Sequence, residues 1–212
     1  ACEYNGSGDI PDDLFSPPAN AVYVATEGGN DLGPGTFAEP FATLDRALVY
    51  ANGTPATPLT IYLRGGEHVF KTQDSYIAIE RGNLYISSYL NEDVTIWPWY
   101  YPGNPSDWGD ERVFHINGPY ENITIDGLNF EGWNVIINPG SPLDNEPLRN
   151  LTVKNCTASE FTHRDNEPNF ISQFVEFLYL DDAAQAGGFD NPDAAHYQVE
   201  NFILSNIQSV GV

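Results

Sequence analysis

A short pattern that returns along the chain restricts the fold more than any other feature. Segments beginning at Asn83, Asn122, Asn150 and Asn201 each contain asparagine, an apolar residue, any residue and a second apolar residue. The last three segments match over a longer stretch, as NITIDGLNF, NLTVKNCTA and NFILSNIQS. A unit this short cannot bury its apolar side alone, so we expect successive copies to stack on one another.

The aligned copies predict where the chain bends and what lies inside. Gly127, Asn155 and Asn206 share one column, and these residue types tolerate the positive φ that a sharp bend requires. Stacking would place Asn155 and Asn206 in a side-chain ladder. Cys156 falls in the next column, with Leu128 and Ile207. Because both of these neighbours are apolar, we expect Cys156 to be a buried free thiol rather than half of a bridge to Cys2.

Strand alternation and composition favour an all-β chain that coils repeatedly. Alternation places Ile123 and Ile125 inside and Thr124 outside. The 19 Gly and 16 Pro residues indicate many turns. We therefore predict a parallel β-helix. A β-sandwich is the alternative, but it would require hairpin loops of the Asn-Gly or Asp-Gly type, which are nearly absent.

The chain divides into an arm and one domain. Residues 1–20 are polar and proline-containing, which predicts an extended arm, and residues 21–212 form the single expected β-helix domain. Within it, residues 21–58 supply a strand and a capping helix, and residues 59–212 supply the coils, with a lateral insertion at about 160–198. The helix is predicted over Phe41–Ala51, because its apolar residues recur at helical spacing.

The N-terminal part of this domain resembles known proteins. The stretch from Ala21 to Leu48, AVYVATEGGND followed by PGTFAEPFATLDRAL, and the later TIYLRGG resemble the start of right-handed parallel β-helix proteins of the pectate-lyase-like superfamily. NITIDGLNF is similar to a coil of that family. The resemblance implies a right-handed β-helix whose first turn is capped by the helix. It also implies secretion and polysaccharide lyase or glycosidase activity, although one fold hosts many functions.

The catalytic residues of that superfamily are not matched. Its lyases commonly use Lys or Arg, often with calcium, to deprotonate a uronate. Here Lys71 lies near a turn, Lys154 is expected to point outward without a partner, and Arg149 aligns with Glu121. We therefore lean against enzymatic activity.

Two polar segments are weak candidates for chemistry. His163, Asp165 and Glu167 could form an acid–base set in the lateral insertion, but a solvated loop is the favoured interpretation. Asp181 and Asp182 could bind calcium through clustered oxygens, but an acidic turn is again favoured. Apart from calcium at this position, we predict no cofactor.

Aromatic residues and glycosylation sequons suggest contacts with carbohydrate. The candidates for stacking on sugar rings are Trp97, Trp99, Tyr100, Tyr101 and Trp108, with packing in a lateral loop as an equal alternative. The candidates for N-glycosylation are Asn5, Asn52, Asn122 and Asn150.

Charge excludes some partners. The 30 Asp and Glu residues against 8 Lys and Arg give a net charge of −22. This balance argues against nucleic acid, anionic membranes and polyanionic glycans, and no apolar run is long enough to span a membrane.

We therefore expect a secreted acidic protein at the cell surface or outside the cell. The favoured role is a non-catalytic structural component that associates end to end through its last strand, Val199 to Ser209, and so forms filaments. The alternative is a polysaccharide-processing enzyme or glycan-binding module. Partners are therefore other copies of the chain or a polysaccharide.

Overall fold

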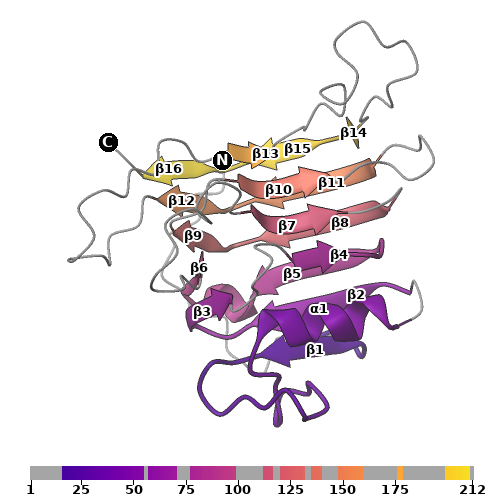
Figure 1. The fold of residues 1–212 in the computed structure, drawn as a ribbon, viewed down its shortest axis with the longest axis vertical. Coiled ribbons are helices and arrows are strands. Elements are labelled where there is room, and N and C mark those ends of the chain that lie inside the picture. The colour runs from indigo at the N-terminus through magenta and orange to yellow at the C-terminus, as the bar shows by residue number, and fades with distance from the viewer. Residues whose placement is uncertain are drawn as a thin grey trace, which may run out of the picture.

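The computed structural model describes residues 16–54, 57–70, 77–98, 112–116, 120–131, 135–139, 148–159, 176–178 and 199–210. Within these residues the protein is mostly β-structure, with three parallel sheets and a single α-helix. The expected all-β class is therefore confirmed. Figure 1 shows the strands stacked from the N-terminal end at the bottom to the C-terminal end at the top.

The largest sheet has seven strands. In their order across the sheet they are β1 (Ala21–Val24), β2 (Leu59–Leu63), β5 (Leu84–Ser88), β8 (Glu121–Asp126), β11 (Leu148–Lys154) and β14 (Val199–Glu200), with β15 (Ile203–Ser205) also paired to β11. Every pairing in it is parallel.

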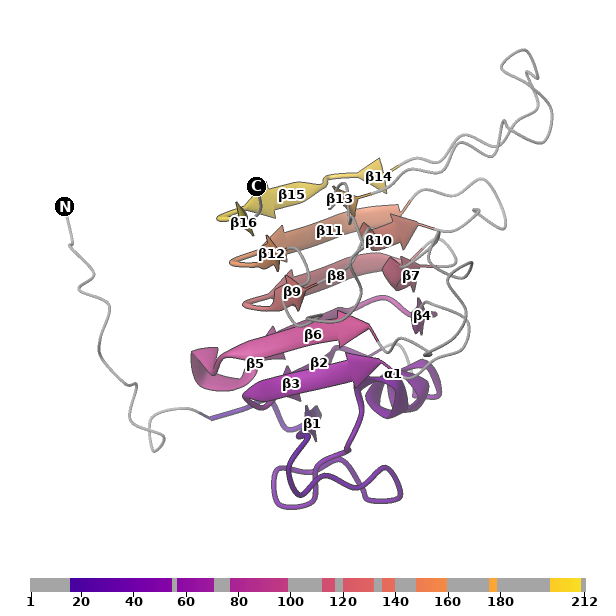
Figure 2. The same ribbon diagram turned by 60° about the vertical axis from the view of Figure 1, so that its left-hand side comes forward.

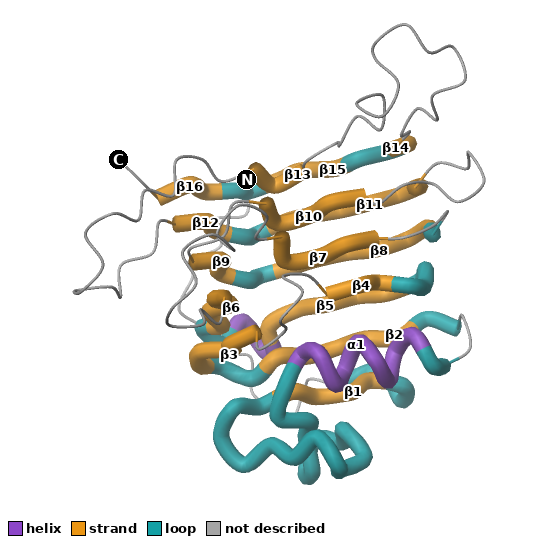
Figure 3. The backbone as a smooth tube through the Cα atoms, in the orientation of Figure 1, coloured by secondary structure: helices purple, strands orange, loops and turns teal. Residues whose placement is uncertain are grey.

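Two smaller parallel sheets complete the fold (Figures 2 and 3). The five-stranded sheet contains β3 (Gly66–Phe70), β6 (Val94–Pro98), β9 (Asn129–Glu131), β12 (Thr157–Ser159) and β16 (Gln208–Val210). The four-stranded sheet contains β4 (Ile77–Ile79), β7 (Arg112–Ile116), β10 (Val135–Pro139) and β13 (Glu176–Leu178). From β2 onward the chain passes through the three sheets in the same order each time, and we call one such pass a layer.

The core lies between the three sheets and follows the predicted alternation. Ile123 and Ile125 are fully buried, whereas Thr124 is half-buried. Leu128 and Cys156 are also fully buried, and Cys156 is a free thiol. Burial raises the pKa of Cys156 to about 11, so the thiol stays protonated at neutral pH. The buried thiol was thus predicted correctly, although Cys2 lies outside the described residues.

The helix is shorter than predicted. α1 spans Leu44–Asn52 rather than beginning at Phe41, because the Thr43 side chain accepts a hydrogen bond from the Arg46 amide and caps the N-terminus. Phe41 instead forms a bridge with Val24 of β1 and is fully buried.

The helix shields one edge of the four-stranded sheet. Both views place α1 below β4 (Figures 1 and 2). The Asn52 side chain donates to the carbonyl of Ala78 at 3.0 Å and accepts from the amide of Glu80 at 3.0 Å, so one side chain satisfies the backbone edge of β4. Leu44 and Leu48 are buried, as the capping prediction requires.

The final layer differs from the sequence prediction. In place of one strand from Val199 to Ser209, the chain forms β14, β15 and β16, separated by Asn201-Phe202 and Asn206-Ile207. Asn201 and Asn206 both have positive φ, at 58° and 50°, and each bend ends a strand. No helix within the described residues is long and apolar enough to cross a membrane.

Candidate functional site

Asparagine ladders run along two bends of the stack. The predicted ladder is confirmed: the Asn206 amide donates to Asn155 at 2.8 Å, and the Asn155 amide donates to Asp126 at 2.8 Å. A second ladder, which the sequence analysis missed, joins Asn201, Asn150, Asn122 and Asn83 through donor–acceptor distances of 2.8 to 3.0 Å. All the ladder asparagines have positive φ, so the residue type serves both the bend and the ladder.

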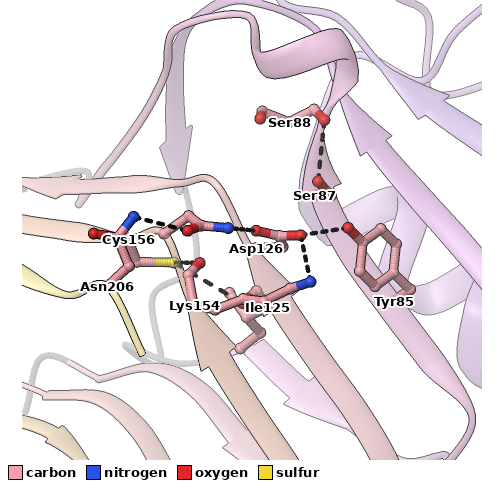
Figure 4. A network of polar contacts seen from close by, with 9 residues as sticks. Tyr85, Ser87, Ser88, Ile125, Asp126, Lys154, Cys156 and Asn206 are labelled. Atoms are coloured by element: carbon pink, nitrogen blue, oxygen red, sulfur yellow. Dashed lines mark hydrogen bonds and ion pairs between the residues drawn. The ribbon is translucent and has the colours of Figure 1, made fainter. Parts of the chain in front are cut away.

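Asp126 ends the first ladder and is the centre of a polar network (Figure 4). Besides Asn155, its carboxylate accepts a hydrogen bond from the Tyr85 hydroxyl at 2.5 Å and pairs with the Lys154 ammonium at 3.2 Å. A carboxylate is suited to this place because it only accepts hydrogen bonds, and all three neighbours donate. The expectation that Lys154 has no partner is therefore wrong.

Strand register explains why these side chains meet. Asp126 and Lys154 are direct neighbours in the pairing of β8 with β11. Tyr85 pairs with Thr124, two residues before Asp126, so its long side chain reaches Asp126 along the diagonal between strands. All three lie on the outer face of the seven-stranded sheet, because the residues between them along the strands are buried.

The network fixes the protonation of Tyr85. Burial, followed by the hydrogen bond to Asp126, raises the pKa of Tyr85 to about 12. The hydroxyl therefore remains a donor over the whole physiological range. Side-chain exposure is 14% for Asp126 and 38% for Lys154, so the ammonium is the more accessible of the two charges.

An aromatic cluster covers the N-terminal part of the same face. Tyr23, Tyr62 and Tyr89 are at most 9% exposed, and their ring centroids are 5.7 Å apart in each pair. The Arg64 guanidinium lies 5.0 Å from the ring centroids of Phe37 and Tyr89. These tyrosines are packed against each other. The accessible part of the outer face of the seven-stranded sheet therefore runs from Tyr85 on β5 toward the C-terminal layers.

The accessible part is nearly neutral. The seven strands of this sheet carry three acidic residues, Glu121, Asp126 and Glu200, and two basic residues, Arg149 and Lys154. Arg149 pairs with Glu200 at 3.1 Å and stands beside Glu121 in the register, as the sequence alignment predicts. The strong negative charge of the chain is therefore carried largely elsewhere.

Most of the predicted site residues lie outside the described part of the chain. This applies to His163, Asp165, Glu167, Asp181, Asp182, Trp99, Tyr100, Tyr101, Trp108 and Asn5. Trp97 lies on β6 of the five-stranded sheet and is half-buried, so it belongs to a different sheet from the Asp126 network. Among the described residues, no group of three or more His, Cys, Asp or Glu side chains is arranged to hold a metal ion.

Three glycosylation candidates use their amides in the fold. The side-chain nitrogen of Asn52 donates to Ala78, that of Asn122 donates to Asn83, and that of Asn150 donates to Asn122. The glycan attachment atom is this same nitrogen. Glycosylation at these positions stays a prediction, and a glycan there would have to share the nitrogen with a structural hydrogen bond.

Comparison with known proteins leaves the family open. No protein-family model matches the sequence, and no curated protein matches it. One solved structure that matches is a rhamnogalacturonan lyase, with 11% sequence identity and a TM-score of 0.45. The match covers 90% of this chain and 51% of the lyase, so the chain spans about half the length of that protein. The fold defines the chain as an all-β protein whose strands stack into three parallel sheets.

Proposed function

We propose that the chain is a right-handed parallel β-helix. The repeated passage through three parallel sheets in one order supports this architecture. Crossover connections between parallel strands of one sheet are right-handed in about 98% of proteins, which supports the hand.

We further propose that the outer face of the seven-stranded sheet binds a polysaccharide. The supporting observation is that Asp126 holds a hydroxyl, an ammonium and an amide, from Tyr85, Lys154 and Asn155, at one place on this face. Carbohydrate recognition requires polar groups in fixed positions beside an aromatic or apolar surface. Thr124 and Thr152, which are neighbours in the register and half-buried, add hydroxyl groups beside the network.

The proposed ligand is a neutral polysaccharide. A polyanion would be repelled by a chain with a net charge of −22, and the face itself offers only two basic residues, both paired with acids. A neutral glycan avoids this repulsion and can use the hydroxyl, amide and ammonium groups as hydrogen-bond partners.

The proposed activity is binding without bond cleavage. Glycoside hydrolysis generally requires two carboxyl groups that flank the scissile bond, one able to give a proton. The carboxylate of Asp126 already accepts from three donors, and its partner across the strand is Lys154 rather than a second acid. Within the described residues, this arrangement favours a rigid binding surface.

Affinity electrophoresis in gels that contain neutral or acidic polysaccharides tests the binding proposal. The unmodified chain should be retarded by at least one neutral polysaccharide and by none of the acidic ones. Lys154→Gln and Tyr85→Phe should reduce the retardation, whereas Glu39→Gln, an exposed position in the N-terminal loop, should not. Equal retardation of all variants would contradict the assigned face, and new reducing ends or unsaturated products would contradict the non-catalytic role.

A second candidate function is the structural role predicted from the sequence. In this role the chain would be a secreted, extracellular or cell-surface component that self-associates. The observation that favours it is the exposure of Ile203 (54%) and Leu204 (47%) on β15, in the last described layer. Apolar side chains of this size on a surface favour association.

A further inference from the structure

A column of hydroxyl side chains crosses the outer face of the seven-stranded sheet. Thr60 of β2 pairs with Tyr85 of β5. Tyr85 pairs with Thr124 of β8, which pairs in turn with Thr152 of β11. Four successive layers therefore place a hydroxyl group at the same register position. In the next layer this position belongs to Ile203, so the hydroxyl column ends at Thr152.

Three members of this column can be reached from outside. Tyr85, Thr124 and Thr152 are half-buried, whereas Thr60 is only 8% exposed. The Tyr85 hydroxyl donates to Asp126. Among the described residues, the hydroxyls of Thr124 and Thr152 are not engaged with another side chain. A threonine hydroxyl both donates and accepts hydrogen bonds, as the hydroxyl groups of a sugar do, so these two residues are suited to contact a glycan.

The groups on this face repeat across the strands but not along them. Along β11, the side chains of Arg149, Thr152 and Lys154 carry a guanidinium, a hydroxyl and an ammonium group. Across the strands, one hydroxyl follows another. A polymer presents the same groups at every unit, so it can repeat one contact only in the direction in which the groups of the protein repeat. That direction runs across the strands, along the stack that Figure 1 shows.

The spacing of the strands restricts the ligand further. Neighbouring strands of a sheet are about 4.8 Å apart, so the hydroxyl groups of the column repeat at about this distance. A glycan whose rings are joined by β-1,4 linkages at equatorial positions is extended and advances by about one strand spacing per sugar. An α-1,4-linked glucan coils instead, so its successive sugars turn away from a straight row of fixed groups.

We infer that this face binds an extended, ribbon-like neutral glycan that runs along the stack with one sugar per layer. This inference rests on the polysaccharide binding proposed above, and it specifies the class of glycan and its direction. Thr124 and Thr152 contact successive sugars. Asp126 and Lys154 lie two residues farther along β8 and β11, so the Asp126 network borders the row of sugars on one side.

Isothermal titration calorimetry of the 212-residue chain with defined oligosaccharides tests the class of glycan. The probes are β-1,4-linked tetrasaccharides of glucose, mannose and xylose, and α-1,4-linked maltotetraose is the comparison of equal length. At least one β-1,4-linked probe should bind on the order of tenfold more tightly than maltotetraose, because a coiled chain loses one or two of the hydrogen bonds. Affinity should rise with length up to the tetrasaccharide, because each added sugar reaches another layer.

Conservative variants test the direction. Thr124→Val and Thr152→Val each remove a hydroxyl and keep the β-branched shape, so each should weaken binding roughly two- to tenfold. Thr95→Val is the matched control, because Thr95 is a half-buried strand residue of the five-stranded sheet. Arg149→Gln should leave the affinity unchanged, because Arg149 shares β11 with Thr152 but lies outside the hydroxyl column. Circular dichroism establishes that each variant is folded.

The outcomes separate the class of glycan from polysaccharide binding itself. Equal or tighter binding of maltotetraose would overturn the ribbon-like ligand and keep the binding face. Weaker binding in Arg149→Gln and Thr152→Val but not in Thr124→Val would place the glycan along β11 and overturn the direction. Retardation by a neutral polysaccharide without binding of any β-1,4-linked tetrasaccharide would overturn this inference alone. Absence of both would overturn the proposed function as well.

Discussion

At the scale of single residues, Asp126 organises the outer face of the large sheet. Its carboxylate accepts from Tyr85, Lys154 and Asn155, which come from β5, from β11 and from the bend that follows β11. Without the carboxylate, the side chain of each donor could adopt more conformations. One residue therefore links three layers and sets the positions of the groups that we propose to contact a ligand.

Replacing Asp126 should change the ionisation of Tyr85. Asp126→Asn removes the charged acceptor, so the pKa of Tyr85 should fall from about 12, while burial keeps it above the ordinary value near 10. Absorbance titration of tyrosinate, with the matching Tyr85→Phe variant subtracted, measures this shift. An unchanged midpoint would show that the hydrogen bond does not stabilise the protonated hydroxyl.

The raised pKa of Tyr85 also predicts that the free energy of unfolding decreases at high pH. Because the pKa of Tyr85 is higher in the folded state than in the unfolded state, its contribution is complete below about pH 10. That contribution is lost as pH rises toward 12.

Gly127 is the second residue whose replacement gives a sharp test. Its φ is 68°, and a Cβ atom there would lie 2.7 Å from the Ser88 hydroxyl oxygen. Gly127→Ala should therefore cost about 1–2 kcal/mol for the backbone conformation, and more for the contact. Urea unfolding measures the loss. Gly53→Ala is the control, because its φ is −81° and the nearest atom would be 3.5 Å away, so stability should change by less than about 0.5 kcal/mol.

At the scale of elements, α1 stabilises the first layers through one face. Leu44 is 3% exposed, whereas Val49, on the same helix, is 64% exposed. Leu44→Asp should destabilise the protein by roughly 2–5 kcal/mol for the lost apolar packing, with a further cost for the buried charge. Val49→Asp should cost less than about 1 kcal/mol. Thermal unfolding of both variants compares them, and equal losses would contradict the burial of this face.

The sequence alone predicts the elements better than it predicts the network. The repeat gives the strands and the bend at Asn155, because each layer reuses the same residue types at the same points. The Asp126–Lys154 pair was missed, although alignment of NITIDGLNF with NLTVKNCTA already puts the two residues in one column. The pair could therefore have been predicted from the sequence by comparing charged residues, as well as apolar residues, between the aligned copies.

Other features could not be read from the repeat. Tyr85 reaches Asp126 along a diagonal between strands, a contact that an alignment of columns does not contain. The connection from β5 to β6, residues 89–93, is longer than the corresponding bend at Gly127, and it carries Leu90 and Asn91 at positive φ. Its Tyr89 closes the aromatic cluster with Tyr62, which depends on packing rather than on spacing in the sequence.

At the scale of the whole molecule, the two ends of the stack are different. The N-terminal end has a loop that occupies the edge of β1, whereas the last described layer leaves Leu204 partly exposed. The charge is also unevenly placed, with a nearly neutral large sheet on a strongly acidic chain. This uneven charge is the reason why we propose the large sheet, and not a more acidic part of the chain, as the surface that binds a neutral polysaccharide.

The most direct test of the proposed binding face is a hydrogen-exchange footprint in the presence of the retarding neutral polysaccharide. The account predicts slower exchange in peptides that contain β8, β11 and the bend at Asn155, because these surround Asp126. Exchange in α1 should stay unchanged. Protection confined to another sheet, or no protection at a saturating concentration, would contradict the assignment of the outer face of the seven-stranded sheet as the binding surface.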